Sequence, residues 1–146
     1  MSTTAQSQTG VKLALAPYIF FYGRCEEALE FYKKVFGGSY EMMRNGDSPM
    51  ANEMPKEDAN KVMHASFTAP GVKFFASDGR ERKAIDSEAG NVSLAITASD
   101  SAEGERIFNA LSEGGKIKMP FGDAFWGGKF GMLDDRFGNE WMIDSR

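Results

Sequence analysis

Cysteine and histidine are scarce in this chain. Its 146 residues include one cysteine, Cys25, and one histidine, His64. A lone cysteine cannot form an internal disulfide, and one cysteine with one histidine cannot supply the four ligands of a finger-type zinc site. A disulfide scaffold and a structural zinc module are therefore excluded.

Excess positive charge and long apolar runs are also absent. Seventeen Lys and Arg against twenty-one Asp and Glu give a formal net charge of -4, without the basic face that nucleic acid requires. No run reaches the roughly 18 apolar residues of a membrane span, and residues 1–10 lack the basic start and apolar centre of a secretory signal. We expect a cytoplasmic protein with a disordered tail at residues 1–10, binding neither nucleic acid nor membrane.

Apolar residues, in contrast, make up 42% of the chain, which is enough for a sizeable core. Their spacing predicts the same order twice: a strand, an amphipathic helix ending in a glycine pair, and three more strands. The expected strands are 12–22, 39–44, 62–68 and 72–77, then 91–97, 116–121, 129–133 and 140–143, with helices within 23–38 and at 101–113.

The duplication predicts an α+β fold of two βαβββ modules within a single domain at 11–146. Module one is 11–78, a polar linker is 79–90, and module two is 91–146. Neither module can bury both faces of its own sheet, so two modules, from one chain or from two, must combine.

Several segments carry a family likeness. They are EEALEFYKKVFGG at 26–38, HASF at 64–67, ASDG at 76–79 and FWGGKFGMLDDRFGNEWMI at 125–143. Over about residues 14–144 the chain resembles the PhnB-like branch of the glyoxalase, bleomycin resistance and dioxygenase group, the vicinal oxygen chelate superfamily. The closing D-x-F-G-x-x-W is the most specific part. The resemblance implies a curled, mostly antiparallel sheet cup with the helices outside, usually in a homodimer, that binds small polar organic molecules or transforms them at a metal ion.

The metal ligands of such relatives do not recur here. In relatives such as glyoxalase I, His and Glu hold the metal at positions that correspond to Pro17, Phe75, Asn91 and Met142. None of these side chains is a strong ligand for a divalent ion, so we expect neither metal nor other cofactor. Some relatives carry a demethylubiquinone methyltransferase label. We do not expect that activity, because no predicted strand is followed by the glycine-rich turn that a nucleotide-like cofactor usually needs.

The hairpin around Pro70 and Gly71 orients the candidate site. Its turn places His64 opposite Ser77. Alternation then predicts two faces: Val62, His64, Ser66, Thr68, Phe75 and Ser77 on a half-polar face towards the cup, and Met63, Ala65, Phe67, Phe74 and Ala76 on a face that packs on helices. His64 could bind a ligand or act as acid or base. The alternatives are a structural histidine tied to neighbours such as Ser77, and a metal ligand.

Three further residues are candidates. Trp126 could form a flat wall over a ligand, or belong to the core or a dimer interface. Lys129 could hold a carboxylate or phosphonate, or be solvated. Glu140 is the carboxylate that strand alternation aims at the cavity. The predicted ligand-binding set is thus His64, Phe75, Ser77, Trp126, Lys129 and Glu140, with His64 and Glu140 as the catalytic candidates.

Other reactive residues have structural explanations. Cys25 lies on the inner stripe of its helix, so we expect a buried, inert thiol. Asp78 is expected to cap a turn, and Asp134 and Asp135 to be turn residues.

Three functions remain open. The first is a metal-free homodimer that binds a small polar or anionic organic ligand, with or without catalysis. The second is a metal-dependent lyase, isomerase or dioxygenase with displaced ligands, and the third is a drug-sequestering protein like the bleomycin-binding relatives. Residues 45–60, which include two prolines, Met50 and Met54, predict a long mobile loop that suits a lid in all three.

Overall fold

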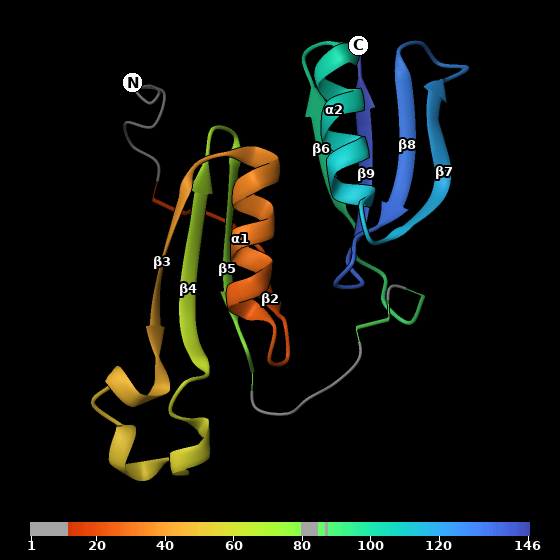
Figure 1. Cartoon of the computed structure of the whole chain (residues 1–146). Helices are drawn as coiled ribbons and strands as arrows, with labels where there is room; N and C mark the ends of the chain where they lie inside the picture. The colour runs from red at the N-terminus through yellow and green to blue at the C-terminus, as the bar shows by residue number, and fades with distance from the viewer. Residues whose placement is uncertain (1–11, 80–84, 87) are drawn as a thin grey trace.

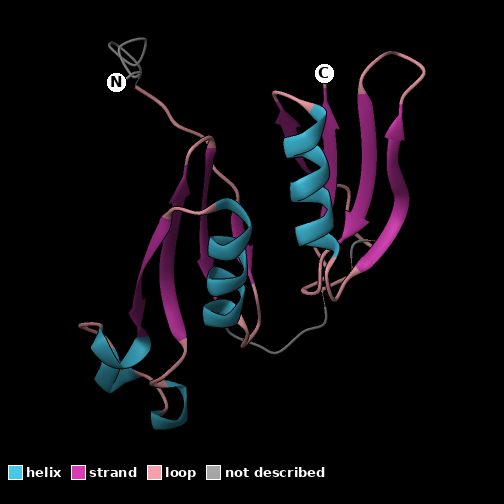
Figure 2. Cartoon of the chain, turned by 45° about the horizontal axis from the view of Figure 1, so that its top comes forward, coloured by secondary structure: helices cyan, strands magenta, loops and turns pink. Residues whose placement is uncertain are grey.

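Two four-stranded sheets organise the chain in a computed structural model that describes residues 12–79, 85–86 and 88–146. Each sheet carries one α-helix on one face (Figure 1, Figure 2). The strand orders are β2-β5-β4-β3 and β6-β9-β8-β7. In both sheets the first and last strands of the module pair in parallel and the remaining neighbours are antiparallel. The predicted α+β fold of two βαβββ modules is confirmed.

The element boundaries follow the sequence pattern closely. The first module contains β2 (Tyr18–Phe20), α1 (Cys25–Phe36), β3 (Ser39–Arg44), β4 (Val62–Ala69) and β5 (Val72–Ser77). The second contains β6 (Leu94–Ala98), α2 (Ser101–Ser112), β7 (Lys116–Asp123), β8 (Lys129–Asp134) and β9 (Glu140–Ser145). Short 3-10 helices at Asn45–Asp47, Ala51–Glu53 and Lys56–Asp58 occupy the predicted loop. The predicted tail at 1–10 and linker residues 80–84 and 87 lie outside the described residues.

The first strand is much shorter than the predicted 12–22. It begins only after Pro17, which has no N–H for a sheet ladder. It ends at Phe20 because the chain then turns into α1, with positive φ angles of 46° at Tyr22 and 101° at Gly23.

Aspartates set the start of both helices. The Asp78 carboxylate accepts hydrogen bonds from the backbone N–H groups of Gly23 (3.1 Å), Cys25 (2.8 Å) and Val62 (2.7 Å), so the expected turn cap also caps α1. Asp100 caps α2 by accepting from the N–H of Glu103 at 2.8 Å. Cys25 is fully buried, and burial raises its pKa to about 12. The predicted burial of this thiol is confirmed.

The two modules share one hydrophobic core. It joins the inner faces of both helices to the sheet faces beneath them and to the turn between β8 and β9. Its members include Leu29, Tyr32, Phe67, Phe74, Phe108, Leu111, Leu133, Phe137, Trp141 and Ile143. Within one chain, therefore, the modules combine through their helix-covered faces, and no α-helix among the described residues covers the opposite face of either sheet (Figure 2).

A buried carboxylate also links the modules. Asp135 is 3% exposed, and its Oδ2 accepts hydrogen bonds from the Tyr32 hydroxyl on α1 and from Trp141 Nε1 (2.8 Å). Its Oδ1 accepts from the N–H groups of Phe137 (2.9 Å) and Asn139 (3.1 Å). Burial raises the pKa of Asp135, and the hydrogen bonds oppose that rise. The D-x-F-G-x-x-W motif is thus a structural joint between α1 and the β8–β9 turn.

Among the residues described, no helix is long and apolar enough to cross a membrane.

Candidate functional site

The β4–β5 hairpin has the register predicted from its turn. Ala65 pairs with Ala76, Ser66 with Phe75 and Phe67 with Phe74. As expected, the buried side chains beneath α1 are Ala65, Phe67, Phe74 and Ala76, whereas the opposite face has exposed His64 and Thr68 and half-buried Ser66 and Phe75.

Three positions at one end of this hairpin differ from the predicted exposure. Val62 (2% exposed) and Ser77 (6% exposed) are buried although they were placed on the half-polar face, and Met63 is only half-buried. The physical reason is the 45–60 loop, which covers this end of the sheet and forms a cavity that all three residues line.

Aromatic rings gather on the face that α1 leaves uncovered. We call Tyr18, Phe20, His64 and Phe75 the aromatic face. The Tyr18 ring centroid lies 5.2 Å from that of Phe20, 5.6 Å from that of His64 and 6.0 Å from that of Phe75. Tyr18 and Phe20 remain 43% and 45% exposed. Exposed aromatic clusters of this kind mark interaction sites.

His64 is hydrogen-bonded to Tyr18 and not to the predicted partner Ser77. Its Nδ1 lies 2.9 Å from the Tyr18 hydroxyl oxygen, whereas Ser77 Oγ donates to the Val62 carbonyl at 3.3 Å. Partial burial raises the pKa of Tyr18, which keeps its hydroxyl protonated and able to donate. When Tyr18 donates to Nδ1, the neutral imidazole carries its proton on Nε2, which becomes a donor for a ligand.

A cavity of about 480 Å³ separates the aromatic face from the loop at 45–60. Tyr18 and Phe20 line it from the sheet, and Met50 and Met54 line it from the loop. Two backbone N–H groups fasten the loop ends, Asn45 N to the Lys61 carbonyl and Gly46 N to the Ala59 carbonyl, both at 2.9 Å. The loop therefore lies over this cavity, and its role as a lid stays a prediction.

A second cavity, of about 580 Å³, extends from the same aromatic residues towards the second module. Tyr18, Phe20 and Tyr22 line one side, and Leu94 and Glu140 line the other. Both volumes fall in the range of small-molecule pockets.

Glu140 lies on the uncovered face of the second sheet, where it is neutralised by a lysine. Lys118 Nζ is 2.6 Å from Glu140 and 3.6 Å from Asp134, and the Ser93 hydroxyl also donates to Glu140. The hydrogen bond from Lys118, followed by that from Ser93, lowers the pKa of Glu140. Asp134, predicted as a turn residue, is instead the last residue of β8 and belongs to this ion cluster.

The sequence did not reveal Lys118. Register shifts within β7, on either side of Met119, break the simple alternation that would have placed Lys118. The one available signal was its position two residues after Lys116, at the start of a predicted strand.

Trp126 and Lys129 lie apart from these groups within one chain. They belong to the β7–β8 hairpin, where Trp126 is 59% exposed and packs against Phe125 and Phe130. Lys129 pairs with Ser145 at one end of β9, and Glu140 begins the other end, roughly 17 Å away along the strand. One chain thus brings His64 and Phe75 together, whereas Ser77 lines the cavity under the loop and Glu140 lines the second cavity.

Metal-ligating side chains do not gather at the expected positions among the described residues. At the positions inherited from metal-dependent relatives, Phe75 packs its ring against His64 and Met142 pairs with Met132. His64 and Glu140 lie on different sheets. In the described part of the chain, no three His, Cys, Asp or Glu side chains gather as a possible metal site.

The paired βαβββ modules match the fold of solved structures from the glyoxalase/bleomycin resistance/dioxygenase superfamily. A member of that superfamily from Sphaerobacter thermophilus DSM 20745 shares the fold, with a TM-score of 0.53 and 17% identity over 93% of this chain and 100% of that chain. The family described as 3-demethylubiquinone-9 3-methyltransferase matches residues 13–144, and the chain belongs to this family.

Three relatives with at least 25% sequence identity support this family. Protein PA1353 from Pseudomonas aeruginosa has a TM-score of 0.79 and 37% identity over 92% of this chain and 98% of that chain. The putative 3-demethylubiquinone-9 3-methyltransferase, PhnB protein, from Bacillus cereus has a TM-score of 0.72 and 25% identity over 92% and 100%. Protein YjdN of Escherichia coli K12 is 30% identical over 90% of this chain and 95% of its own length. The resemblance to the PhnB-like branch is confirmed.

Proposed function

We propose that this protein binds a small polar organic molecule on the aromatic face, beneath the loop at 45–60. The observation that carries the proposal is that Tyr18 and Phe20, both more than 40% exposed, line two adjacent cavities of about 480 and 580 Å³. Large aromatic side chains in a cavity with a few polar groups are typical of small-molecule sites.

The site offers distinct places for the two parts of such a ligand. The apolar part lies between the Tyr18 and Phe20 rings and the thioethers of Met50 and Met54, which adapt easily to different shapes. His64 does not line either cavity but lies beside Tyr18, which lines both, so a polar part that extends past Tyr18 accepts a hydrogen bond from His64 Nε2 while Tyr18 holds Nδ1. Entry requires the loop to open.

The proposal concerns binding, and a chemical step would rest on His64 as acid or base. Methyl transfer is not part of it, because no described strand leads through a glycine-rich turn into a helix. Drug sequestration is compatible with the same aromatic face, so turnover against a metabolite panel distinguishes the two functions. Cytoplasmic location stays a prediction from the sequence.

A metal-dependent enzyme is the less favoured alternative, since the donor groups are too few and too far apart. Elemental analysis of protein purified without chelator tests it. We expect well below one Zn, Ni or Fe per chain. A stoichiometric metal that is lost in His64→Ala would favour the metal-dependent alternative.

Substitution of His64 tests the site itself. With the fluorescent probe 8-anilinonaphthalene-1-sulfonate, we expect His64→Ala to weaken binding by about 1–3 kcal/mol, because the sulfonate loses its donor. The melting temperature should change little, because His64 is exposed. Thr68→Ala, an exposed position on the same face of β4, is the matched control and should bind the probe normally. Unchanged affinity together with a melting temperature lowered by several degrees would identify a structural histidine.

A further inference from the structure

A third cavity lies where the two modules meet, and we call it the junction cavity. Its volume is about 390 Å³. The first module contributes the turn between β2 and α1, and the second contributes the turn after α2 and the β8–β9 turn. It borders the second cavity at Tyr22 and Ile85, but Tyr18, Phe20 and His64 do not line it.

The charged side chains available to the junction cavity are basic. Arg24, Lys116 and Arg136 line it. Asp134 and Asp135 line it too, but the Asp134 carboxylate faces Lys118 at 3.6 Å, and Asp135 is occupied by Tyr32 and Trp141. The acids that pair with the two arginines, Glu27 and Glu113, are not among the lining residues.

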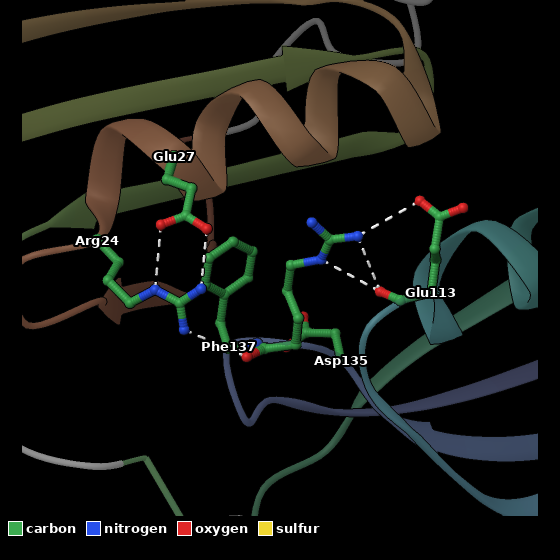
Figure 3. Close-up of polar contacts among 6 residues, drawn as sticks. Arg24, Glu27, Glu113, Asp135 and Phe137 are labelled. Carbon is green, nitrogen blue, oxygen red and sulfur yellow. Dashed lines mark hydrogen bonds and ion pairs between the residues drawn. The ribbon is translucent and has the colours of Figure 1, made fainter.

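Both guanidinium groups are held in place before any ligand arrives. Arg24 donates to both carboxylate oxygens of Glu27, at 3.1 and 2.8 Å, and its guanidinium carbon lies 4.5 Å from the Phe137 ring centroid (Figure 3). Arg136 donates from Nε (3.1 Å) and Nη2 (3.0 Å) to the Glu113 carbonyl and stacks over Phe31 at 4.3 Å. Fixed guanidinium groups lose little conformational entropy on binding an anion.

Donors remain available at this site. Within the described residues, neither Arg136 Nη1 nor Lys116 Nζ makes a hydrogen bond to the protein. Gly114, at a φ of 78°, leaves space beside the arginine, since a Cβ there would lie 3.1 Å from Arg136 Nε. Phe21, Tyr22 and Ile85 supply an apolar wall.

We propose that the junction cavity binds a small organic oxyanion, a carboxylate or phosphate attached to a compact apolar group. The oxyanion accepts hydrogen bonds from Arg136 Nη1 and Lys116 Nζ, and the apolar group rests against Phe21, Tyr22 and Ile85. Charge-assisted bonds from two cations give the affinity. Because both modules line the cavity, the ligand stabilises the folded chain against separation of its modules.

Calorimetric titration with phenyl phosphate, benzoate and the neutral benzyl alcohol tests this site. We expect at least one of the two anions to bind about tenfold or more tightly than benzyl alcohol, and the tighter anion identifies the preferred group. Lys116→Gln should weaken that anion about tenfold. Lys129→Gln is the matched control, because Lys129 lies at the other end of the β7–β8 ladder and should not affect binding.

Amide chemical shifts locate the binding. The tighter anion should shift the signals of Gly114, Gly115 and Gly138, and any additional shift of Ala65 and Ser66 in β4 reports separate binding at the aromatic face. Benzyl alcohol binding as well as either anion, full affinity in Lys116→Gln, or shifts confined to β4 and β5 would each refute the junction site. None of these results depends on the proposed site at the aromatic face.

Discussion

The buried carboxylate of Asp135 receives hydrogen bonds from two side chains and two backbone groups. All four partners are donors, so a negatively charged acceptor is the group that suits the position. Two of them are large core residues, Tyr32 and Trp141, whose polar atoms have been removed from water. The loss of one acceptor oxygen would leave buried donors unsatisfied.

We therefore predict that Asp135→Asn lowers the free energy of unfolding by about 2–4 kcal/mol. Either orientation of the amide turns an NH2 group towards donors that need an acceptor. Urea denaturation measures the loss. Asp123→Asn, at an exposed position in β7, is the control and should stay within about 0.5 kcal/mol of the parent protein. An Asp135→Asn variant as stable as the control would contradict the role of this carboxylate.

The ion pair of Lys118 and Glu140 leads to a prediction about pH. Lys118 and Ser93 lower the pKa of Glu140 in the folded chain, so ionised Glu140 contributes stability above its unfolded pKa of about 4.3. That contribution is lost as the pH falls through the lower folded pKa. We expect Lys118→Met to be less stable than the parent at pH 7, and the difference to shrink between about pH 5 and pH 3.

Urea denaturation across this pH range provides the measurement. Lys129→Met is the control, because Lys129 forms no ion pair with the described residues. A Lys118→Met deficit of equal size at pH 7 and pH 3 would show that lost packing, and not the charge, is responsible.

At the scale of elements, the glycine pairs that follow the two helices have the same structural role. A Cβ on Gly38 would lie 2.1 Å from the Thr68 carbonyl oxygen, and a Cβ on Gly115 would lie 2.1 Å from the Asp134 carbonyl oxygen. In each module the second glycine thus lets the chain pass directly against a strand of its own sheet. The repeat in the sequence reflects the same close approach made twice.

Alanine substitutions at Gly37 and at Gly38 distinguish the cost of backbone strain from the cost of a steric clash. Both residues have positive φ angles, 76° and 80°, but a Cβ on Gly37 meets no atom within 4 Å. We predict a loss of about 1–2 kcal/mol for Gly37→Ala, from backbone strain alone. Gly38→Ala should lose about 3 kcal/mol more, because the backbone of β4 must shift. Equal losses in chemical denaturation would contradict the close approach.

Local patterns in the sequence were sufficient to predict most elements and one register. The turn at Pro70 and Gly71 determines which residues of β4 face β5, so the exposed side of His64 could be predicted. The contact between His64 and Tyr18 could not, because it depends on parallel pairing of β2 with β5, more than fifty residues apart in sequence. Long-range pairings leave no periodic trace.

The site was only partly predictable for the same reason. Phe75 and Ser77 share a hairpin with His64, so alternation could assign all three to one face of the sheet. Tyr18 and Phe20 lie in the predicted strand at 12–22, but the sequence does not show which strand β2 pairs with, so their contacts with other rings could not be predicted. Lys118 was missed because strand irregularities in β7 break the alternation.

At the scale of the molecule, exposed apolar side chains favour the predicted homodimer. Besides the aromatic face, Phe125 and Trp126 are 95% and 59% exposed, and Ile117 and Met119 are about half exposed. A twofold dimer buries both patches when the first patch of each chain packs against the second patch of its partner.

We predict a light-scattering mass of twice 16.1 kDa at micromolar concentration. The double substitution Phe125→Ser, Trp126→Ser should shift the protein towards the monomer, because it removes the most exposed aromatic pair. The matched control is Leu13→Ser, Leu15→Ser, which removes two exposed leucines that precede β2. A parent mass of 16.1 kDa under these conditions would contradict the prediction.

The shared core determines how the chain melts. Tyr32 of α1 is surrounded by Phe137 and Trp141 of the second module, so neither half retains its interior without the other. The halves of the duplication have thereby lost their independence, and heat should unfold them in one cooperative transition with equal calorimetric and van't Hoff enthalpies. Two ancestral repeats thus behave thermodynamically as one folding unit.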